Sequence, residues 1–503
     1  MKNLCDILYR GSKDYPHRVA LIFGGKKFTY DDVYKKAASI SSDLRIEGVK
    51  KGDRVAVLLD NSPEFVFSYF GVLMSRAIVV PINHMFKRDE IKYILEDSGS
   101  SFLITSSTYA ALAQELNVIV QTLKRVFYTN QQIEPIRAID NALSPCEPED
   151  LAVFLYTSGT TGHPKAAMLS HRNLMANCQS SSKAICVSRR DTVLCFLPLF
   201  HSFAATVCML MPLSNGARMV ILKSPRPIKK LLRSIRKNRV TIFVGIPSIY
   251  NILKDIKLPK FLPRPILRLF NPIRLAISGA AALPVEVFTK FEQKYGLPLL
   301  EGYGLTEASP VVSLNPLKGK RKPGSIGLPL PGVRIKIIGD DGAELKVEQI
   351  GELCCSGDNV MRGYFGKDED NKATLKDGWL LTGDMAKIDK EGYAYIMGRK
   401  KEMVNVRGLN VYPREIEEVL YQNPKIKEAA IIGIPDPHKG EVPKGFIVLK
   451  NAGSLSEHEI ISYLKEHLAL YKVPKKIEIV EELPKNSLGK ILKRVLAQRS
   501  QLT

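Results

Sequence analysis

Apolar residues recur along this chain in two alternating patterns, one with the spacing of helices and one with the continuity of buried strands. Helical spacing of apolar positions predicts helices over 28–44 and 63–74, and the apolar runs DRVAVLLD and AIVVPIN that follow them predict strands. Such alternation is typical of βα units around a mostly parallel sheet.

The same alternation returns after residue 217. The runs ARMVILK, VTIFVGIP, IRLAISGA and LPLLEGYG predict strands, and helices are expected over 227–238 and 284–295. These strands are short, apolar and rich in β-branched residues, as strands buried on both faces of a parallel sheet are.

Between residues 326 and 396 the pattern changes to short alternating strands joined by Asp-Gly and Glu-Gly turns, which predicts an antiparallel or barrel-like piece. The charged run RKKE at 399–402 then precedes a segment with its own strand, helix and hairpin signals. We expect an α/β fold with a large N-terminal domain, 1–398, of parallel-sheet βα subdomains plus the barrel-like piece. A small mobile α+β C-terminal domain is expected over 399–503.

One segment, 192–217, has no charged side chain and is long enough to cross a bilayer. Pro198 and Pro212 interrupt it and His201 lies inside it, so a buried core helix is the better prediction. The N-terminus carries Asp6 and Arg10 where a signal peptide needs an apolar core, so the mature chain is expected to start here. Eight cysteines without a CxxC pair favour a reducing compartment, and we expect a cytoplasmic protein.

The 503 residues include 73 Lys and Arg against 51 Asp and Glu, a net charge of +22 that attracts anions. Fourteen basic residues and one acidic residue fall between positions 223 and 274. Cations there alternate with Leu, Phe and Ile, which indicates either a segment resting on anionic lipid at the inner membrane face or a solvated basic face. No RNP-like aromatic pattern or zinc finger accompanies the charge, so nucleic acid is not an expected partner.

The first candidate site is the motif YTSGTTGHPK at 156–165, which directly follows an apolar strand. Its backbone N–H groups, its hydroxyls and its lysine can cradle a polyphosphate, although a flexible Gly-Thr loop is the other interpretation. The order of residues differs from a Walker A loop. The candidate phosphate ligands are Thr157, Ser158, Gly159, Thr160, Thr161 and Lys165.

Two further motifs, SGAAALP and LLEGYGLTE, lie at the carboxyl ends of predicted strands, where open α/β sheets bind ligands. Tyr303 stands between glycines and can offer its ring face to a purine. Thr306 can bind a phosphate and Glu307 can bind Mg²⁺. A core tyrosine and a solvated glutamate are the alternatives.

The remaining motifs are GWLLTGD and PKNSLGK. Asp384 in the first can accept both hydroxyls of a ribose, and Arg399 can hold the same sugar or a phosphate. Lys490 follows a Ser-Leu-Gly turn in the second motif. A single lysine in such a place is usually solvated, so Lys490 becomes a candidate site residue only together with the other motifs.

The ordered set YTSGTTGHPK, LFHSF, EGYGLTE, GWLLTGD, GRKKE and PKNSLGK resembles the adenylate-forming superfamily of acyl-CoA synthetases, peptide-synthetase adenylation domains and luciferases. The resemblance covers about residues 30–494. It implies a two-step enzyme that uses ATP and Mg²⁺. A carboxylate first attacks the α-phosphate of ATP to give acyl-AMP, and a thiol such as that of CoA then displaces AMP.

The resemblance also implies roles for single residues. Catalytic roles fall to Lys490, which would contact the substrate carboxylate and the α-phosphate, and to Thr306, Glu307 as the metal ligand, and His201 at the acyl entrance. Beside the phosphate ligands, the nucleotide site would comprise Gly279, Ala280, Ala281, Glu301, Gly302, Tyr303, Asp384 and Arg399. Lys401 falls at the hinge position of the family, and Gly408 would line the pantetheine channel. Arg407 beside it either meets a phosphate of CoA or has no role.

The sequences of three segments are most similar to those of medium- and long-chain fatty-acid–CoA ligases: LFHSF, VGIPSIYN and GRKKEMVNVRGLNVYP. Phe203, Val244 and Gly245 would line an apolar acyl tunnel, and the segment TIFVGIPS lacks the aspartate of amino-acid-activating relatives. Transfer to the phosphopantetheine of an acyl carrier protein, an aryl or short-chain acid as substrate, a nucleic-acid-binding protein and an inactive scaffold are the alternatives. The scaffold is disfavoured because every matched catalytic position is filled.

Overall fold

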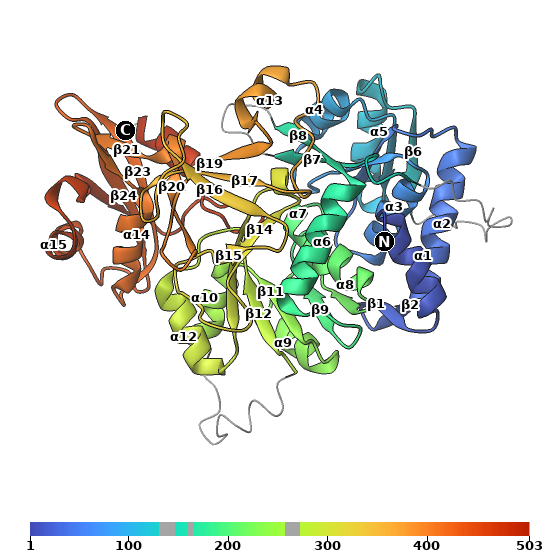
Figure 1. Ribbon diagram of the computed structural model, residues 1–503, viewed down its shortest axis with the longest axis horizontal. Helices are drawn as coiled ribbons and strands as arrows, with labels where there is room; N and C mark the ends of the chain where they lie inside the picture. Colours follow the sequence, from blue (N-terminus) through green and yellow to red (C-terminus); the bar gives the residue numbers. More distant parts are fainter. Residues whose placement is uncertain (130–145, 158–163, 257–271, 502–503) are drawn as a thin grey trace.

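The computed structural model describes residues 1–129, 146–157, 164–256 and 272–501 (Figure 1). The predicted fold class is confirmed: parallel-sheet units make up most of a large N-terminal domain, an antiparallel half-barrel follows, and a separate C-terminal domain ends the chain. Figure 1 shows the C-terminal domain, in orange and red, at the opposite end of the long axis from the N-terminal helices in blue.

One sheet of the N-terminal domain has the strand order β6-β5-β3-β4-β7-β8 and is parallel except for the antiparallel pair β7 and β8. The central residues Val55 to Leu58 are fully buried, as predicted for a strand covered on both faces. The strands are β3 (Arg54–Leu58), β4 (Ile78–Pro81), β5 (Phe102–Thr105), β6 (Arg125–Tyr128), β7 (Leu151–Thr157) and β8 (Lys165–Ser170).

Helices connect these strands, and their starts are fixed by local capping. Thr29 caps the helix predicted over 28–44: its hydroxyl accepts from the Asp32 N–H at 3.1 Å, and the Asp32 carboxylate accepts from the Thr29 N–H at 2.8 Å. Ser62 caps the next helix in front of Pro63. The helices are α1 (Cys5–Asp14), α2 (Tyr30–Ile46), α3 (Pro63–Met74), α4 (Arg88–Ser98), α5 (Ala110–Ile119) and α6 (His171–Ile185).

A second sheet has the order β15-β14-β13-β12-β11-β9-β10-β1-β2 and is parallel from β13 to β1. Its strands are β1 (Val19–Phe23), β2 (Lys26–Thr29), β9 (Thr192–Cys195), β10 (Arg218–Ile221), β11 (Ile242–Gly245), β12 (Leu275–Ser278), β13 (Leu299–Gly304), β14 (Val311–Leu314) and β15 (Leu328–Pro329). The helices after residue 227 are α9 (Ile228–Lys237), α10 (Pro247–Asp255) and α12 (Val285–Tyr295), and the predictions of 227–238 and 284–295 are confirmed.

The uncharged segment 192–217 is buried inside this domain. After β9 it forms α7 (Ser202–Ala204), a π-helical stretch η2 (Ala205–Leu210) and α8 (Met211–Ser214), with every residue from Ser202 to Leu213 buried. The prediction of a core helix is confirmed, although the π-helical geometry was not foreseen. Among the described residues, no helix has the length and apolar character that crossing a membrane requires.

The barrel-like piece and the C-terminal domain each contain one sheet. The antiparallel order β16-β17-β19-β18, with β20 beside β19, comes from β16 (Arg334–Ile338), β17 (Gly351–Ser356), β18 (Leu375–Lys376), β19 (Trp379–Ile388) and β20 (Ala394–Arg399). The C-terminal sheet contains β21 (Val404–Val406), β22 (Leu409–Val411), β23 (Ile426–Asp436), β24 (Gly440–Leu449) and β25 (Lys476–Ile479). Helices α13 (Asp368–Thr374), α14 (Pro413–Gln422), α15 (Glu457–His467) and α16 (Lys493–Gln501) and the short turns η3 (Thr306–Ala308) and η4 (Lys400–Glu402) complete these parts.

Candidate active site

A cavity of about 300 Å³ lies where the C-terminal domain meets the N-terminal domain. Its wall combines the loop after β12, strand β13, the ends of β19 and β20, helix α14 and the turn that carries Lys490. It brings together residues from five of the predicted motifs: Ala280, Ala281, Glu301, Gly302, Tyr303, Asp384, Arg399 and Lys490.

The Asp384 carboxylate in this wall has two side-chain partners. It lies opposite Arg399 in the β19–β20 pairing, and the guanidinium Nε is 2.7 Å from its Oδ1. The Tyr303 hydroxyl donates to Oδ2 at 2.5 Å. Burial raises the pKa of Asp384 while the Arg399 charge opposes that rise. Two fixed partners therefore hold this carboxylate in place at the cavity wall.

Lys490 enters the cavity from a tight turn of the C-terminal domain. Its backbone N–H donates to Asn486 Oδ1 at 2.9 Å, and the Asn486 N–H donates back to the Lys490 carbonyl at 2.9 Å. The side chain stays open to solvent in the cavity, but surrounding protein removes enough water to lower its pKa, and the charge of Arg399 lowers it further. The turn thus presents a cation beside Asp384 and Arg399.

His201, which precedes α7, lies within electrostatic range of Lys490. Its Nδ1 accepts from the Phe203 N–H at 3.2 Å, so the ring caps α7. Burial, together with the nearby Lys490 charge, lowers the pKa of His201 to about 4, so the imidazole is neutral at physiological pH. The next residue, Ser202, has its hydroxyl oxygen 3.3 Å from that of Thr306, which joins α7 to η3.

Glu307 and Lys165 lie on elements that flank the phosphate loop. The Tyr364 hydroxyl donates to Glu307 Oε1 at 2.7 Å, and Lys165 forms an ion pair with Asp370. Thr157 pairs with Lys165 across β7 and β8, so the strands bracket the loop between them. The predicted loop residues Ser158, Gly159, Thr160 and Thr161 lie outside the described residues.

The predicted acyl-side residues meet at the carboxyl ends of β11 and β12. Val244 and Gly245 end β11, and the Gly279 N–H donates to the Gly245 carbonyl at 3.3 Å. A Cβ on Gly279 would lie 2.8 Å from Cζ of Phe203, which is shorter than an ordinary van der Waals contact between non-bonded carbon atoms. The glycine is therefore what lets the Phe203 ring lie against this strand end.

Gly408 and Lys401 are among the predicted residues that do not line the cavity. Gly408, with φ of 83°, is at the exposed tip of the hairpin between β21 and β22, and Lys401 is in η4. The structure therefore does not bring them together with the nucleotide-side residues.

Several charged residues of the cavity wall were not foreseen. Arg414 on α14 donates to the Ile396 carbonyl at 3.0 Å, and its guanidinium lies 4.0 Å from Glu301 across the domain boundary. Glu417, Glu418, Lys485 and Lys493 line the same wall. The segment REIEEVL reads as an ordinary amphipathic helix, so only its position against β13 distinguishes it.

The donor set suits a magnesium nucleotide. The fixed Asp384 carboxylate can accept ribose hydroxyls, Arg399 and Lys490 can face phosphates, and the glycine-flanked Tyr303 can face a base. No group of three or more His, Cys, Asp or Glu in the described ranges could hold a metal by itself. Mg²⁺ commonly binds one or two carboxylates together with substrate phosphates, which Glu307 fits.

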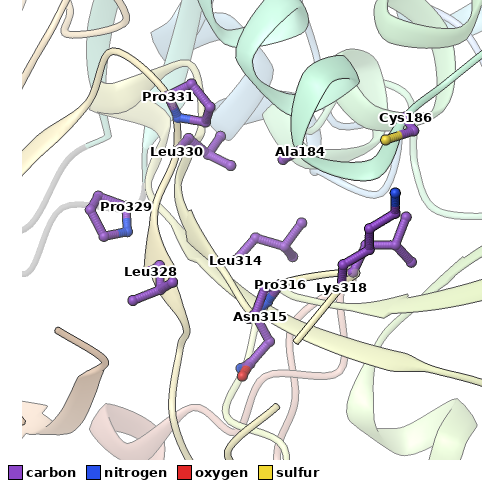
Figure 2. Close-up of a pocket in the computed structure, with 11 residues that line it drawn as sticks. Ala184, Cys186, Leu314, Asn315, Pro316, Lys318, Leu328, Pro329, Leu330 and Pro331 are labelled. Atoms are coloured by element: carbon purple, nitrogen blue, oxygen red, sulfur yellow. The ribbon is translucent and has the colours of Figure 1, made fainter. Parts of the chain in front are cut away.

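Another hollow of about 290 Å³ lies away from these residues. Figure 2 shows Ala184 and Cys186, from the end of α6, facing the segments 314–318 and 328–331 across it. Its lining is mostly leucine and proline and contains none of the predicted site residues.

Comparison with known proteins agrees with this geometry. Residues 8–365 match the AMP-binding enzyme family and residues 415–490 match the AMP-binding enzyme C-terminal domain. The chain belongs to the AMP-binding enzyme family, and the prediction of an adenylate-forming enzyme is confirmed.

Two curated relatives align over nearly the whole chain. A long-chain-fatty-acid–CoA ligase of Bacillus subtilis is 37% identical, with 99% of this chain and 94% of the relative covered. A feruloyl-CoA synthase of an Amycolatopsis species is 34% identical, with 97% of each chain covered.

Solved structures of similar proteins also cover the whole chain. ATP-bound MatB from Rhodopseudomonas palustris has a TM-score of 0.89 at 30% identity and covers 100% of this chain and 99% of its own. The same protein without ligand gives a TM-score of 0.76 at the same coverage. The overall arrangement of this chain is thus closer to the ATP-bound form.

Proposed function

We propose that this chain is an AMP-forming acid–thiol ligase that activates a fatty acid with ATP and Mg²⁺ and joins it to CoA. The observation that carries the proposal is the position of Lys490, which a turn of the C-terminal domain presents to the same cavity as the Asp384–Arg399 pair. The similarity to the long-chain-fatty-acid–CoA ligase of Bacillus subtilis supports the substrate class.

The residues of the cavity divide the work of the first step. ATP is the source of the adenylyl group, and Glu307 would hold Mg²⁺, which when bound would offset phosphate charge. The base is held by Tyr303 together with Gly279, Ala280, Ala281, Glu301 and Gly302. The ribose is held by Asp384 and Arg399. The phosphates are held by Thr306 and by the 157–165 loop with its Lys165. Lys490 stabilises the negative charge that builds up as the substrate carboxylate approaches the α-phosphate, which is electrostatic stabilisation of the transition state.

The acyl side is apolar, which fits an aliphatic chain. Phe203 and Val244 are buried, Gly245 leaves room beside Tyr250, and His201 is neutral, so His201 supplies no positive charge to hold a second carboxylate. An aromatic acid is the second candidate, because the feruloyl-CoA synthase is nearly as similar as the fatty-acid ligase.

The second step needs the cavity to open on one side. We assign residues 1–398 and 399–503 as the two domains, with the hinge at Lys401, which lies in η4 directly after β20. Rotation at this point withdraws Lys490 from the acyl-AMP and brings Gly408, at the exposed hairpin tip, to the thiol channel, where the absence of a Cβ allows close approach of pantetheine. An acyl carrier protein is the alternative source of the thiol.

The basic helix α9 presents a surface that is separate from the cavity. Lys229, Lys230, Arg233, Arg236 and Lys237 are all exposed on it, and Leu232 is 40% exposed beside them. Exposed cations around an apolar residue favour contact with anionic lipid. Residues 257–271 of the same basic segment lie outside the described residues.

Co-sedimentation with vesicles of phosphatidylglycerol or phosphatidylcholine tests this surface. Binding is expected only to the anionic vesicles, falling with salt and with the charge reversals Lys229→Glu and Lys230→Glu. The matched reversals Lys26→Glu and Lys27→Glu, at exposed lysines of β2, should retain binding. Equal sedimentation with both lipids would remove the membrane surface from the proposal.

The substrate assignment is tested with purified protein, ATP, Mg²⁺, CoA and a ladder of acids from acetate to oleate together with ferulate. Mass spectrometry of AMP and acyl-CoA should show thioester formation peaking at long aliphatic acids. A peak at ferulate would assign the aromatic class instead. Acyl-AMP without acyl-CoA would point to a carrier protein, which an acceptor competition then measures.

A further inference from the structure

Two cysteines far apart in the sequence meet at the start of the first helix. Cys5 begins α1 and Cys146 precedes β7, yet their Sγ atoms are 3.7 Å apart. Nothing in the proposed catalytic steps uses either thiol, and neither lines the nucleotide cavity. All eight cysteines of the chain are free thiols in this structure.

The surroundings hold the two sulfurs in place. The Asn3 side-chain amide donates to the Cys146 carbonyl at 2.8 Å, which fixes the backbone of Cys146 beside the N-terminus of the chain. The Cys146 thiol also lies 3.6 Å from the Leu73 carbonyl at the end of α3. The short Sγ–Sγ distance is therefore supported on both sides by backbone contacts.

His171 makes this pair chemically different from an ordinary buried thiol pair. Its Nδ1 accepts a hydrogen bond from the Leu4 N–H at 3.2 Å, which fixes the orientation of the ring beside the start of α1. The His171 side chain is hydrogen-bonded to Cys146, and hydrogen bonds from Cys5 and from His171 lower the pKa of the Cys146 thiol. A thiolate is the form of cysteine that reacts with oxidants.

Access to the pair differs from access to the other buried cysteines. Cys5 is half-buried, whereas Cys146 is buried. Cys195 and Cys208 also form a hydrogen-bonded pair, but both are fully buried. Cys186 is exposed and is the remaining accessible thiol.

We propose that Cys5 and Cys146 form an oxidisable dithiol that peroxide closes to an intramolecular disulfide, with His171 as the positioning residue. The Cys146 thiolate attacks hydrogen peroxide; an S–O bond forms, the O–O bond breaks, and hydroxide leaves as water after protonation. Cys5 then attacks the sulfenic sulfur; the S–S bond forms, the S–O bond breaks, and the hydroxide takes the Cys5 proton. Two thiols and one peroxide give one disulfide and two waters.

The bond would tie α1 to the segment that leads into β7, the strand that ends at Thr157 before the phosphate loop. The inference does not depend on the proposed ligase activity. Its test measures thiols and peptides, and so a failure here leaves the proposed function untouched.

The test uses the full chain with the exposed thiol removed by Cys186→Ser, so that seven cysteines remain of the eight. After peroxide treatment, the free-thiol count is expected to fall from seven to five, and non-reducing peptide mapping should recover Cys5 linked to Cys146. Dithiothreitol should restore all seven thiols. An unchanged count, or a linked Cys195–Cys208 peptide, would overturn the proposal.

Variants separate the chemistry from a structural effect. Cys5→Ser should stop the reaction at a Cys146 sulfenic acid that dimedone traps, whereas Cys195→Ser should still form the disulfide. His171→Gln, which keeps an acceptor for the Leu4 N–H, should slow thiol loss roughly tenfold, because a hydrogen bond to a thiolate is lost. Equal rates with and without His171, in variants with unchanged circular dichroism, would contradict its role.

Discussion

The buried carboxylate Glu301 offers the most quantitative test of the structure. Its side chain is 1% exposed, its Oε1 accepts from the Leu283 N–H at 3.0 Å, and its Oε2 has no hydrogen-bond partner in the ranges that the structure describes. Arg414, 4.0 Å away, is too distant for a direct hydrogen bond. Burial raises the pKa of Glu301 from 4.5 to about 7, although the Arg414 charge opposes the rise.

The sign of the effect on stability follows from this rise. A carboxyl group whose pKa is higher in the folded state contributes stability that is fully present below pH 4.5 and is lost as the pH rises through about 7. At about 1.36 kcal/mol per pKa unit, the loss is about 3 kcal/mol once the group is fully ionised. Glu301→Gln stays neutral and keeps an acceptor for Leu283, so it should exceed the wild type in free energy of unfolding by about that amount above pH 8.

The assay is thermal unfolding of both proteins at pH 5.0 and 8.5. With an unfolding entropy of about 2.1 cal/mol/K per residue over roughly 400 residues, 3 kcal/mol corresponds to a Tm increase of about 3–4 °C at pH 8.5, and about 1 °C is expected at pH 5.0. Glu369→Gln, at an exposed position of α13, is the matched control and should show no pH-dependent difference. A Tm difference independent of pH, or a wild type that is more stable at pH 8.5, would refute the reasoning.

Three further predictions concern the cavity. Tyr303→Phe removes the hydroxyl that donates to Asp384 but keeps the ring. The KM for ATP should therefore rise roughly tenfold, while kcat stays within about threefold of the wild-type value. A loss confined to kcat would argue against this role of the hydroxyl. Gly279→Ala should reduce kcat/KM for long acids at least tenfold, because its Cβ would lie 2.8 Å from the Phe203 ring. Adding Phe203→Leu should restore part of the lost kcat/KM. No recovery in the double variant would mean that this clash does not cause the loss. His201, with a pKa of about 4, should contribute no inflection between pH 5.5 and 8 to the pH profile of adenylation, so an inflection near 6.5 that disappears in His201→Asn would contradict the structure.

The sequence predicts the regular elements well where one face or both faces of an element are buried. The strand run DRVAVLLD and the helix over 63–74 follow from apolar pattern and capping alone, and the structure has β3 and α3 there. The motifs after β12 and β13 meet because neighbouring parallel strands end at one edge of a sheet. This topology places five of the eight predicted residues in the cavity wall, namely Ala280, Ala281, Glu301, Gly302 and Tyr303.

Contacts that depend on tertiary placement could not be read from the sequence. Arg414 contacts Glu301 only because α14 docks against β13, and the pattern of α14 is that of any amphipathic helix. The π-helical geometry of η2 has no distinct apolar period in so short a segment. The meeting of Cys5 and Cys146 across most of the N-terminal domain has no local signal either.

The central claim, that Lys490 serves the adenylation step alone, is tested by separating the two half-reactions in Lys490→Ala. ATP–pyrophosphate exchange should fall 10²- to 10³-fold, roughly what loss of one transition-state donor costs, while thioester formation from supplied acyl-AMP and CoA should stay within about threefold of the wild type. Lys476→Ala, at an exposed position of the same domain, is the matched control and should change neither rate. Equal losses in both half-reactions of Lys490→Ala, or no loss in the exchange reaction, would contradict the account.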